Sequence, residues 1–405
     1  MDGGEAEDRE SAETNSKRRK AEEQGSKRGS ERIYPNRESL GMAMYNRKEG
    51  TPRSLSCACS YVPEEIIVAA GMRPRRVIPQ GRPLEADAYL HPNTCGYIKS
   101  LLASLIAGGT SEMAGLVVVN SCDGMRRLND ICRSHVSGFP LFFIEVPKKK
   151  DPDSIEFFAS ELRRFAANLE AQYPGVTLSD DSLRAAIKAC NDARHLVQEI
   201  FLLQREPGSS VRGSSVFNLC LEGATSDAAS FADDVRAFVA ESREIKRGVP
   251  GQGARVVLTG NSIHQPDLVT LIEDSGGAVV GLDTCLAGRH HDRLVDESSR
   301  DPVRALAERY LLRAPCARME GLDERFQYLK GLVIDSGADA IIYCMTKFCD
   351  AHAYDVPVMQ EGFKEAGIPF LLVENDYEWT GLEQTRTRIE GLFEMLGERR
   401  SRRDV

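Results

Sequence analysis

Short apolar runs, each followed by a segment with helical periodicity, constrain the fold of this chain more than any other feature. GLVVVN at 115–120 and AIIYC at 340–344 are apolar at nearly every position rather than at every second one. Such runs are typical of strands that are buried on both faces of a parallel sheet. The helical segment CDGMRRLNDICRSH follows the first run, and a helix is expected at 356–367 after the second. This alternation predicts βαβ units and therefore an α/β fold.

The alternation occurs in two parts of the chain that a helical stretch separates. Between 151 and 247 the sequence carries three capped amphipathic segments and little strand signal. We therefore predict two open parallel-sheet domains, flavodoxin-like or Rossmann-like, that face each other with a helical insertion. The predicted parts are a disordered charged tail at 1–35, an N-terminal α/β domain at 36–150, a helical bridge at 151–247, a C-terminal α/β domain at 248–398 and a tail at 399–405.

Charge and hydropathy exclude several classes of protein. The 405 residues carry a net charge of −9, whereas a general nucleic-acid binder has a basic surface. No apolar run approaches the roughly 18 residues that a membrane span needs, and the N-terminus lacks the apolar segment of a secretory signal. We expect a cytoplasmic protein that binds neither membranes nor nucleic acid. KRRK at 17–20 fits either a nuclear signal or a solvated charge run in the tail.

The cysteine content points to thiol chemistry. Eleven cysteines in a chain without an export signal indicate free thiols rather than disulfides. No C-x2-C pair occurs, so any metal site has to combine cysteines that are distant in sequence. Scattered cysteines at the rim of a cleft suit an iron–sulfur cluster at least as well as zinc.

Five cysteines fall where parallel-sheet proteins bind ligands, at the carboxyl ends of strands or in the first turn of a helix. A helix N-terminus favours the thiolate, the form that binds iron or zinc, because free N–H groups and the helix dipole stabilise negative charge. The alternative for each cysteine is packing as a small apolar residue. The five candidates are Cys95, Cys122, Cys285, Cys344 and Cys349. The cysteines within or beside helices, expected to be packing residues, are Cys132, Cys190, Cys220 and Cys316.

Three other patterns carry less information. GVPGQGAR at 248–255 precedes a strand, whereas a phosphate-binding loop follows one. GRHHD at 288–292 has no second matching cluster, so His290 and His291 are expected to be structural or surface loop residues. No G-x-S-x-G occurs, so nothing supports a serine hydrolase.

Several stretches along most of the chain carry motifs that are informative when they are taken together. They are YVPEEIIVAAGMRP, LHPNTCGYIKSLLASL, NSCDGMRRLNDI, FFIEVP, DTCLAGRH, IIYCMTKFCD and GIPFLLVENDYEWTGLEQTRTRIEGLFEML. Together, over roughly 55–398, they resemble the D component of 2-hydroxyacyl-CoA dehydratases. That family includes benzoyl-CoA reductase subunits and double-cubane cluster proteins.

The resemblance implies a [4Fe–4S] cluster held by three cysteines. By motif the ligands are Cys95, Cys122 and Cys349, with Cys285 next, although Cys95 stands in CGY where the family usually has CPF. The double-cubane relatives, with an [8Fe–9S] cluster, use more cysteines, and Cys59 and Cys344 are then candidates. Glu65 resembles a family position that moves a proton near the substrate. The alternative for Glu65 is an ordinary acid in the first turn of a helix.

The resemblance also implies an activity and partners. A separate ATP-hydrolysing iron–sulfur activator delivers a low-potential electron, a ketyl radical forms on an acyl-CoA thioester, and water is eliminated, which makes the enzyme a lyase. In the reductase branch the electrons stay in the substrate. The expected assembly pairs this chain with a similar second subunit, as a heterodimer or homodimer. The remaining alternatives are a double-cubane reductase, a non-catalytic electron-transfer subunit and a cluster-free α/β protein.

Overall fold

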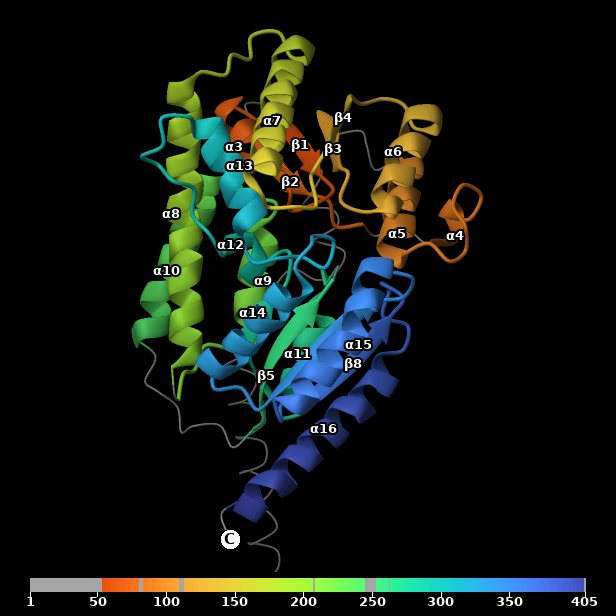
Figure 1. Cartoon of the computed structure of the whole chain (residues 1–405), viewed down its shortest axis with the longest axis vertical. Coiled ribbons are helices and arrows are strands. Elements are labelled where there is room, and N and C mark those ends of the chain that lie inside the picture. Colours follow the sequence, from red (N-terminus) through yellow and green to blue (C-terminus); the bar gives the residue numbers. More distant parts are fainter. Residues whose placement is uncertain are drawn as a thin grey trace, which may run out of the picture. The chain divides into compact units, whose positions relative to one another are not determined.

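A computed structural model of the chain describes residues 53–79, 83–108, 113–206, 208–244, 253–261 and 263–403. These residues form an α/β fold with two four-stranded sheets of parallel strands, which confirms the predicted fold class (Figure 1). The predicted tail at 1–35, with KRRK at 17–20, lies outside the described residues. None of the described helices is long and apolar enough to cross a membrane.

The first sheet has the strand order β2–β1–β3–β4. Its central strand β1 was not predicted from the sequence, because two of its four residues are serines and the segment is too short to show a period. Leu55 of β1 is nevertheless fully buried, and β1 pairs with β2 on one side and β3 on the other. The elements of this part are β1 (Ser54–Cys57), α3 (Glu64–Ala69), β2 (Arg73–Arg76), α4 (Pro83–Ala86), α5 (Gly96–Ile106), β3 (Gly115–Val119), α6 (Asp123–His135) and β4 (Leu141–Ile144).

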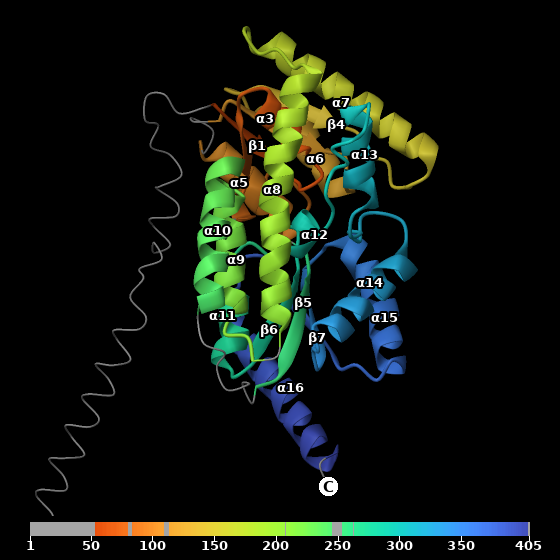
Figure 2. The ribbon, with the colours of Figure 1, turned by 90° about the vertical axis from the view of Figure 1, so that its left-hand side faces the viewer.

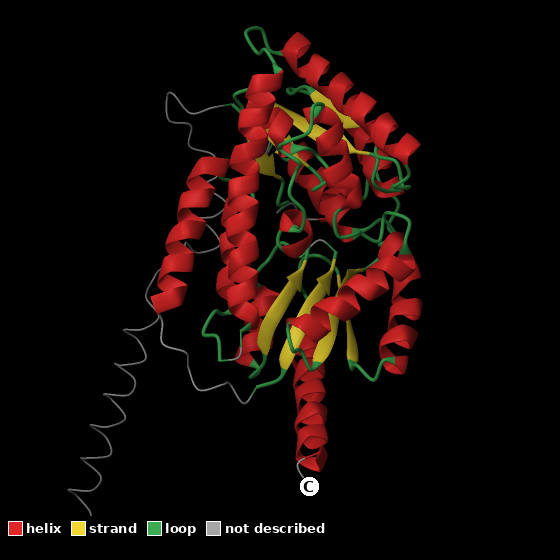
Figure 3. Cartoon of the chain, turned by 60° about the vertical axis from the view of Figure 1, so that its left-hand side comes forward, coloured by secondary structure: helices red, strands yellow, loops and turns green. Residues whose placement is uncertain are grey.

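The second sheet repeats this topology with the order β6–β5–β7–β8 (Figure 3). Both of its faces are covered, since the neighbouring residues Val256 and Val257 of β5 enter two different apolar cores. In each sheet the chain order reverses beside the first strand, and open parallel sheets bind ligands at such points. The elements are β5 (Arg255–Gly260), α11 (Asp267–Asp274), β6 (Ala278–Asp283), α12 (Gly288–His291), α13 (Pro302–Leu312), α14 (Leu322–Asp335), β7 (Ala340–Thr346), α15 (Asp350–Glu365), β8 (Phe370–Asn375) and α16 (Leu382–Arg403).

Helices connect the two sheets in sequence, and one of them belongs to both cores. Helix α8 runs beside α10 (Figure 2). Its residues Leu183 and Ile187 pack in the first core, whereas Val197 and Ile200 pack in the second. The four helices are α7 (Pro152–Gln172), α8 (Asp180–Arg205), α9 (Gly213–Gly223) and α10 (Ala228–Glu244). The short helix α9 was not predicted; its segment GSSVFNLCLEG has glycine at both ends.

Helix α13 lies after the second sheet begins but packs against the first. It contacts α7, and its residues Leu306 and Tyr310 belong to the first core. Both side chains are fully buried. A division of the sequence into consecutive domains therefore does not describe the packing, because the chain returns to the first core after β6.

Helix α15 begins earlier than its sequence indicates. A proline is favoured in the first turn of a helix, and on that ground the helix was expected to start at 356. In the structure α15 starts at Asp350 and carries Pro357 in its interior. Proline there costs a backbone hydrogen bond, and the burial of Val356 and Met359 against the second sheet compensates for it. The early start makes Cys349 the N-cap residue of α15.

Substitutions of two glycines test how closely the backbone packs at the end of β5. Gly260, the last residue of β5, has a φ of 140°, and a Cβ there would lie 1.8 Å from the Cys344 carbonyl oxygen. Replacing Gly260 by Ala is expected to lower the free energy of unfolding by about 2–5 kcal/mol. In Gly331→Ala on α14 the new Cβ meets no atom within 4 Å, and this control should stabilise by about 0.5–1 kcal/mol. Denaturant unfolding measures both, and equal effects would contradict the packing described.

Candidate functional site

Three of the cysteines singled out by sequence occupy the same structural position. Cys95, Cys122 and Cys349 are the N-cap residues of α5, α6 and α15, and none of these side chains makes a capping hydrogen bond. Each therefore stands at a helix end that carries free N–H groups and partial positive charge. The structure thus supports the expectation that these thiols lie where negative charge is favoured.

The Cys95 and Cys349 thiols interact directly across the two halves of the chain. Cys95 donates a hydrogen bond to the Cys349 sulfur, which lowers the pKa of Cys349 well below its ordinary value. The same bond raises the pKa of Cys95. The two buried thiols therefore shift each other's pKa in opposite directions.

Arg318 interacts with five cysteines. Its Nη2 lies 3.8 Å from the Cys349 sulfur and its Nη1 lies 3.5 Å from the Cys316 sulfur. Its charge also acts on other thiols within electrostatic range. We name the five cysteines the thiol group: Cys59, Cys95, Cys122, Cys316 and Cys349. They come from both sheets and from the loop that precedes α14.

The thiol group is not a preformed ion site. Within the part of the chain that the structure describes, no three His, Cys, Asp or Glu side chains are placed to hold a single metal ion. The sulfurs are instead distributed about a guanidinium whose Nε is shielded from solvent and has no hydrogen-bond partner. Arg318 forms no ion pair with a carboxylate among the described residues. Its hydrogen-bond partners among the described residues are the Cys316 and Cys349 sulfurs.

A second cation approaches the thiol group from the first sheet. The Lys148 Nζ donates hydrogen bonds to the carbonyls of Asn120 and Ser121, at 3.0 and 2.7 Å. Burial lowers the pKa of Lys148, and the nearby Cys122 sulfur opposes this effect. The residues just before Cys122 are thus fixed by a lysine that lies near its sulfur.

Cys316 was expected to be a packing residue, and the structure places it in the thiol group instead. Burial would raise its pKa, but the guanidinium groups of Arg318 and Arg289 outweigh burial and lower the pKa to about 6. The arginine two residues after Cys316, in PCAR, is the sequence signal that could have indicated this. The other cysteines assigned to packing are buried in helices, and burial raises the pKa of Cys132 and of Cys220 to about 12.

The remaining two candidates have other contacts, although Cys285 shares the neighbour Arg289 with Cys316. The Cys285 sulfur is 3.9 Å from Arg76 Nη2 and 4.0 Å from His264 Nε2. Cys344 is fully buried within β7, where Asn375 Nδ2 donates to its sulfur at 3.0 Å. Burial raises the pKa of Cys344 to about 12, which describes an inert packing thiol. Metal binding by Cys285 or Cys344 stays a prediction that this placement does not test.

Glu65 is fully buried in an ion pair. Its Oε1 lies 2.6 Å from Arg194 Nη2 on α8, and the Tyr310 hydroxyl on α13 donates to its Oε2 at 3.0 Å. The adjacent Glu64 backbone N–H donates to the same hydroxyl at 3.1 Å. These contacts join α3, α8 and α13 and give Glu65 a structural role. Proton transfer by Glu65 at a substrate stays a prediction.

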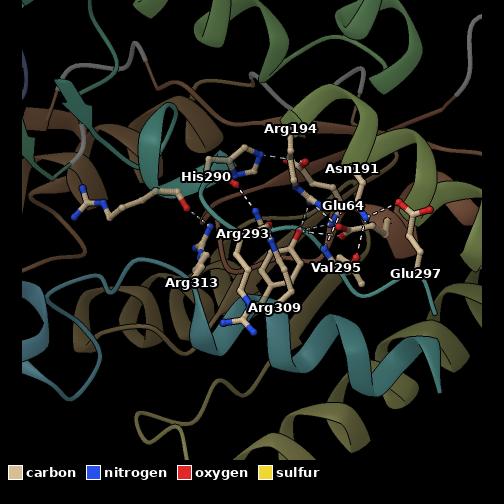
Figure 4. A network of polar contacts seen from close by, with 12 residues as sticks. Glu64, Asn191, Arg194, His290, Arg293, Val295, Glu297, Arg309 and Arg313 are labelled. Carbon is tan, nitrogen blue, oxygen red and sulfur yellow. Dashed lines mark hydrogen bonds and ion pairs between the residues drawn. The ribbon is translucent and has the colours of Figure 1, made fainter. Parts of the chain in front are cut away.

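The Glu65 ion pair belongs to a larger buried network, drawn in Figure 4. Asn191 on α8 donates to the Val295 carbonyl at 2.9 Å, and its side-chain oxygen accepts from the Val295 N–H at 3.0 Å. His290 Nε2 lies 3.2 Å from a Glu64 oxygen, and its neighbour His291 is 5% exposed. The two histidines were predicted to be structural or surface loop residues; they lie instead in the short helix α12, His290 half-buried and His291 buried, which supports a structural role.

Comparison with known proteins identifies the family. Residues 59–396 match the family model described as 2-hydroxyglutaryl-CoA dehydratase, D-component. The chain belongs to this family. The match begins at Cys59 and spans the whole thiol group. This confirms the family that the sequence motifs indicated.

Three relatives show the range of the dehydratase family. The chain is 27% identical over 355 residues to the (R)-phenyllactyl-CoA dehydratase beta subunit of Clostridium sporogenes, covering 87% of this chain and 94% of that protein. It is 24% identical over 350 residues to a benzoyl-CoA reductase subunit of Thauera aromatica, covering 84% and 90%. It is 24% identical over 347 residues to lactoyl-CoA dehydratase subunit beta of Anaerotignum propionicum, covering 83% and 90%. All three are subunits of enzymes.

The buried histidines predict a pH dependence of stability. Burial, followed by the charges of His290 and of nearby arginines, holds the pKa of His291 well below 6.5. Below pH 6.5 the unfolded chain therefore binds a proton that the folded chain does not, and stability falls. We expect His291→Gln to reduce the slope of unfolding free energy between pH 7.5 and 5.5 by up to about 1.4 kcal/mol per pH unit.

The control for this prediction is the exposed His195 on α8. His195→Gln should leave the slope unchanged, because that side chain is solvated in both states. Urea unfolding at several pH values measures the slope. An unchanged slope in His291→Gln would show that His291 titrates normally in the folded chain.

Proposed function

We propose that this chain is the iron–sulfur subunit of a 2-hydroxyacyl-CoA dehydratase-like enzyme that eliminates water from an acyl-CoA thioester. The observation that supports this best is the thiol group itself. Arg318 contacts the sulfurs of Cys316 and Cys349, and its charge acts on three further cysteines, in a chain of the dehydratase family. Packing alone gives no reason for five thiols to gather about one arginine charge.

The residues fit an anionic, thiolate-ligated group. Cys95, Cys122 and Cys349 would hold a [4Fe–4S] cluster, since thiolates are the ligands of such clusters. Three helix N-termini supply partial positive charge, and Arg318 and Lys148 supply full charges. The Arg318 Nε, which has no protein partner, also fits an anionic neighbour. We leave Cys285 out of the proposed set, because its described contacts are Arg76 and His264.

When bound, such a cluster supplies a low-potential electron for the reaction. The chain's own contribution is to keep its ligands in the thiolate form and to shield them. Contact with Cys95 lowers the pKa of Cys349, which favours the thiolate form of this proposed ligand. A lowered pKa favours metal loading, because a thiol must lose its proton to bind.

Partners and substrate belong to the same proposal. Two of the relatives are named as beta subunits and the third as a reductase subunit, which supports a similar second subunit for this chain. We propose that an ATP-hydrolysing iron–sulfur activator delivers the electron and that the substrate is an acyl-CoA. The assembly is a heterodimer or a homodimer.

A reductase is the second candidate function. The likeness to the benzoyl-CoA reductase of Thauera aromatica favours it, and so does a thiol group larger than three, because double-cubane [8Fe–9S] proteins use more cysteines. Product analysis separates the two. With activator and ATP, a dehydratase forms an unsaturated acyl-CoA, whereas a reductase adds electrons that stay in its substrate. A non-catalytic electron-transfer subunit would bind the cluster and alter no acyl-CoA.

Metal content tests the proposed ligands. Anaerobic reconstitution with iron and sulfide is expected to give about four iron atoms per chain, or about eight for the double-cubane alternative. Cys95→Ala, Cys122→Ala and Cys349→Ala should each lose most of this iron, since three ligands hold the cluster. Cys220→Ala, a buried cysteine in α9, is the matched control and should keep it. A folded wild-type chain that takes up no iron would refute the proposal.

A further inference from the structure

We infer that Arg318 is the counter-charge of the proposed iron–sulfur group and sets its reduction potential. This inference rests on the proposed function and goes beyond it, because it assigns a role to a residue that is not a ligand. Arg318 acts through the sulfurs of other residues and is therefore a positioning residue.

The Arg318 guanidinium donates hydrogen bonds to cysteine sulfurs. The two terminal nitrogens of one guanidinium reach two different cysteines, Nη1 to Cys316 at 3.5 Å and Nη2 to Cys349 at 3.8 Å. A planar guanidinium presents its donors in a fixed fork, so both contacts form without rearrangement. Cys349 is a proposed ligand, and Arg318 thus donates directly to a sulfur that would bind iron.

The charge of Arg318 has no other acceptor among the described residues. Arg325, in the helix that follows, is paired with Asp355 at 2.7 Å, and Arg289 with Asp283 at 3.5 Å. Arg318 has no such carboxylate, and its Nε is shielded and unpaired. A shielded charge that has sulfurs but no carboxylate beside it is costly unless negative charge gathers there. A thiolate-ligated cluster carries the negative charge that would balance it.

The loop that carries Arg318 is fixed on both sides. The Met319 N–H donates to the Cys316 carbonyl at 2.9 Å, which closes a tight turn. Arg325 Nη1 donates to the carbonyls of Cys316 and Met319, at 3.3 and 2.6 Å. Because Arg325 also forms a two-bond ion pair with Asp355 on α15, the loop is tied to the helix that Cys349 caps.

The Glu320 N–H donates to the Lys148 carbonyl at 3.1 Å, which ties the other end of the loop to the first sheet. The guanidinium is therefore held in place before any metal binds. A preorganised charge stabilises negative charge without the cost of reorganisation.

Such a charge acts on reduction potential in one direction. One-electron reduction, with the electron taken from the activator, adds one negative charge to the cluster and its sulfurs. A cation and N–H donors at those sulfurs stabilise the reduced form more than the oxidised form, and net charge and hydrogen bonds to sulfur are known determinants of potential. Without Arg318 the potential should become more negative, so that the cluster is harder to reduce.

The test separates the effect of the positive charge at position 318 from the effect of the shape of the arginine side chain. Arg318→Met removes the charge and the donors, Arg318→Lys keeps the charge, and Arg127→Met on α6 is a matched control whose side chain is 62% exposed. Each reconstituted full-length chain is analysed for iron and titrated with reductant under EPR detection. We expect a clear negative shift of the midpoint potential in Arg318→Met, a much smaller shift in Arg318→Lys and none in Arg127→Met. Thermal unfolding of the metal-free chains shows whether each variant folds.

Each outcome decides the inference. If Arg318→Met loads iron and keeps the wild-type potential, the inference is overturned while the proposed function stands. If Arg318→Met folds but loses iron and Arg318→Lys loads it, the counter-charge role is supported. Loss of iron from both folded variants would show that the shape of arginine matters rather than its charge, and the inference fails. A wild-type chain that binds no iron refutes the proposed function itself.

Discussion

A fully buried ion pair fixes α8, the helix that enters both apolar cores, to the helices of the first core. Glu65 on α3 and Arg194 on α8 contact at 2.6 Å, and the Tyr310 hydroxyl closes the arrangement from α13. Removing one partner of a buried ion pair leaves the other charge uncompensated. The thiol group draws on both sheets, since Cys95 and Cys122 come from the first and Cys349 from the second. The network therefore anchors the helix whose side chains pack in the cores on which both sets of thiols depend.

The arrangement of charges at the site lowers the stability of the metal-free chain. Three helix N-termini, Arg318 and Lys148 bring positive charge to one place, and among the described residues no carboxylate pairs with Arg318. The guanidinium of Arg318 lowers the pKa of the two cysteines that it contacts, Cys316 and Cys349, which favours negative charge on their sulfurs. Local sequence choices that oppose stability are expected at functional sites. Positive charge is thus concentrated at the carboxyl ends of two sheets, at a cost in the stability of the metal-free chain. This concentration indicates a bound ligand more strongly than any single cysteine does.

Sequence reasoning succeeded where a signal was local. The apolar runs of β3 and β7 and the placement of Cys95 and Cys122 at the starts of helices follow from short patterns and from the geometry of parallel sheets. It failed where tertiary packing decided. Strand β1 is too short to carry a period. The early turns of α15 bury two polar side chains that find distant partners, His352 with Tyr343 and Asp355 with Arg325.

Contacts between residues that are far apart in the sequence could not be predicted either. Glu65 pairs with Arg194 only because α8 passes α3 in the folded chain. The sequence of α3 does not indicate this pairing, since it shows only two acids in the first turn of a helix. Cys316 joins the thiol group through a turn after α13, a helix that returns to the first core. Since the Cys95–Cys349 hydrogen bond already spans both sheets, a metal group bound to these two sulfurs would replace a weak contact by covalent bonds. Loading would then stabilise the arrangement of the two sheets as well as the site between them.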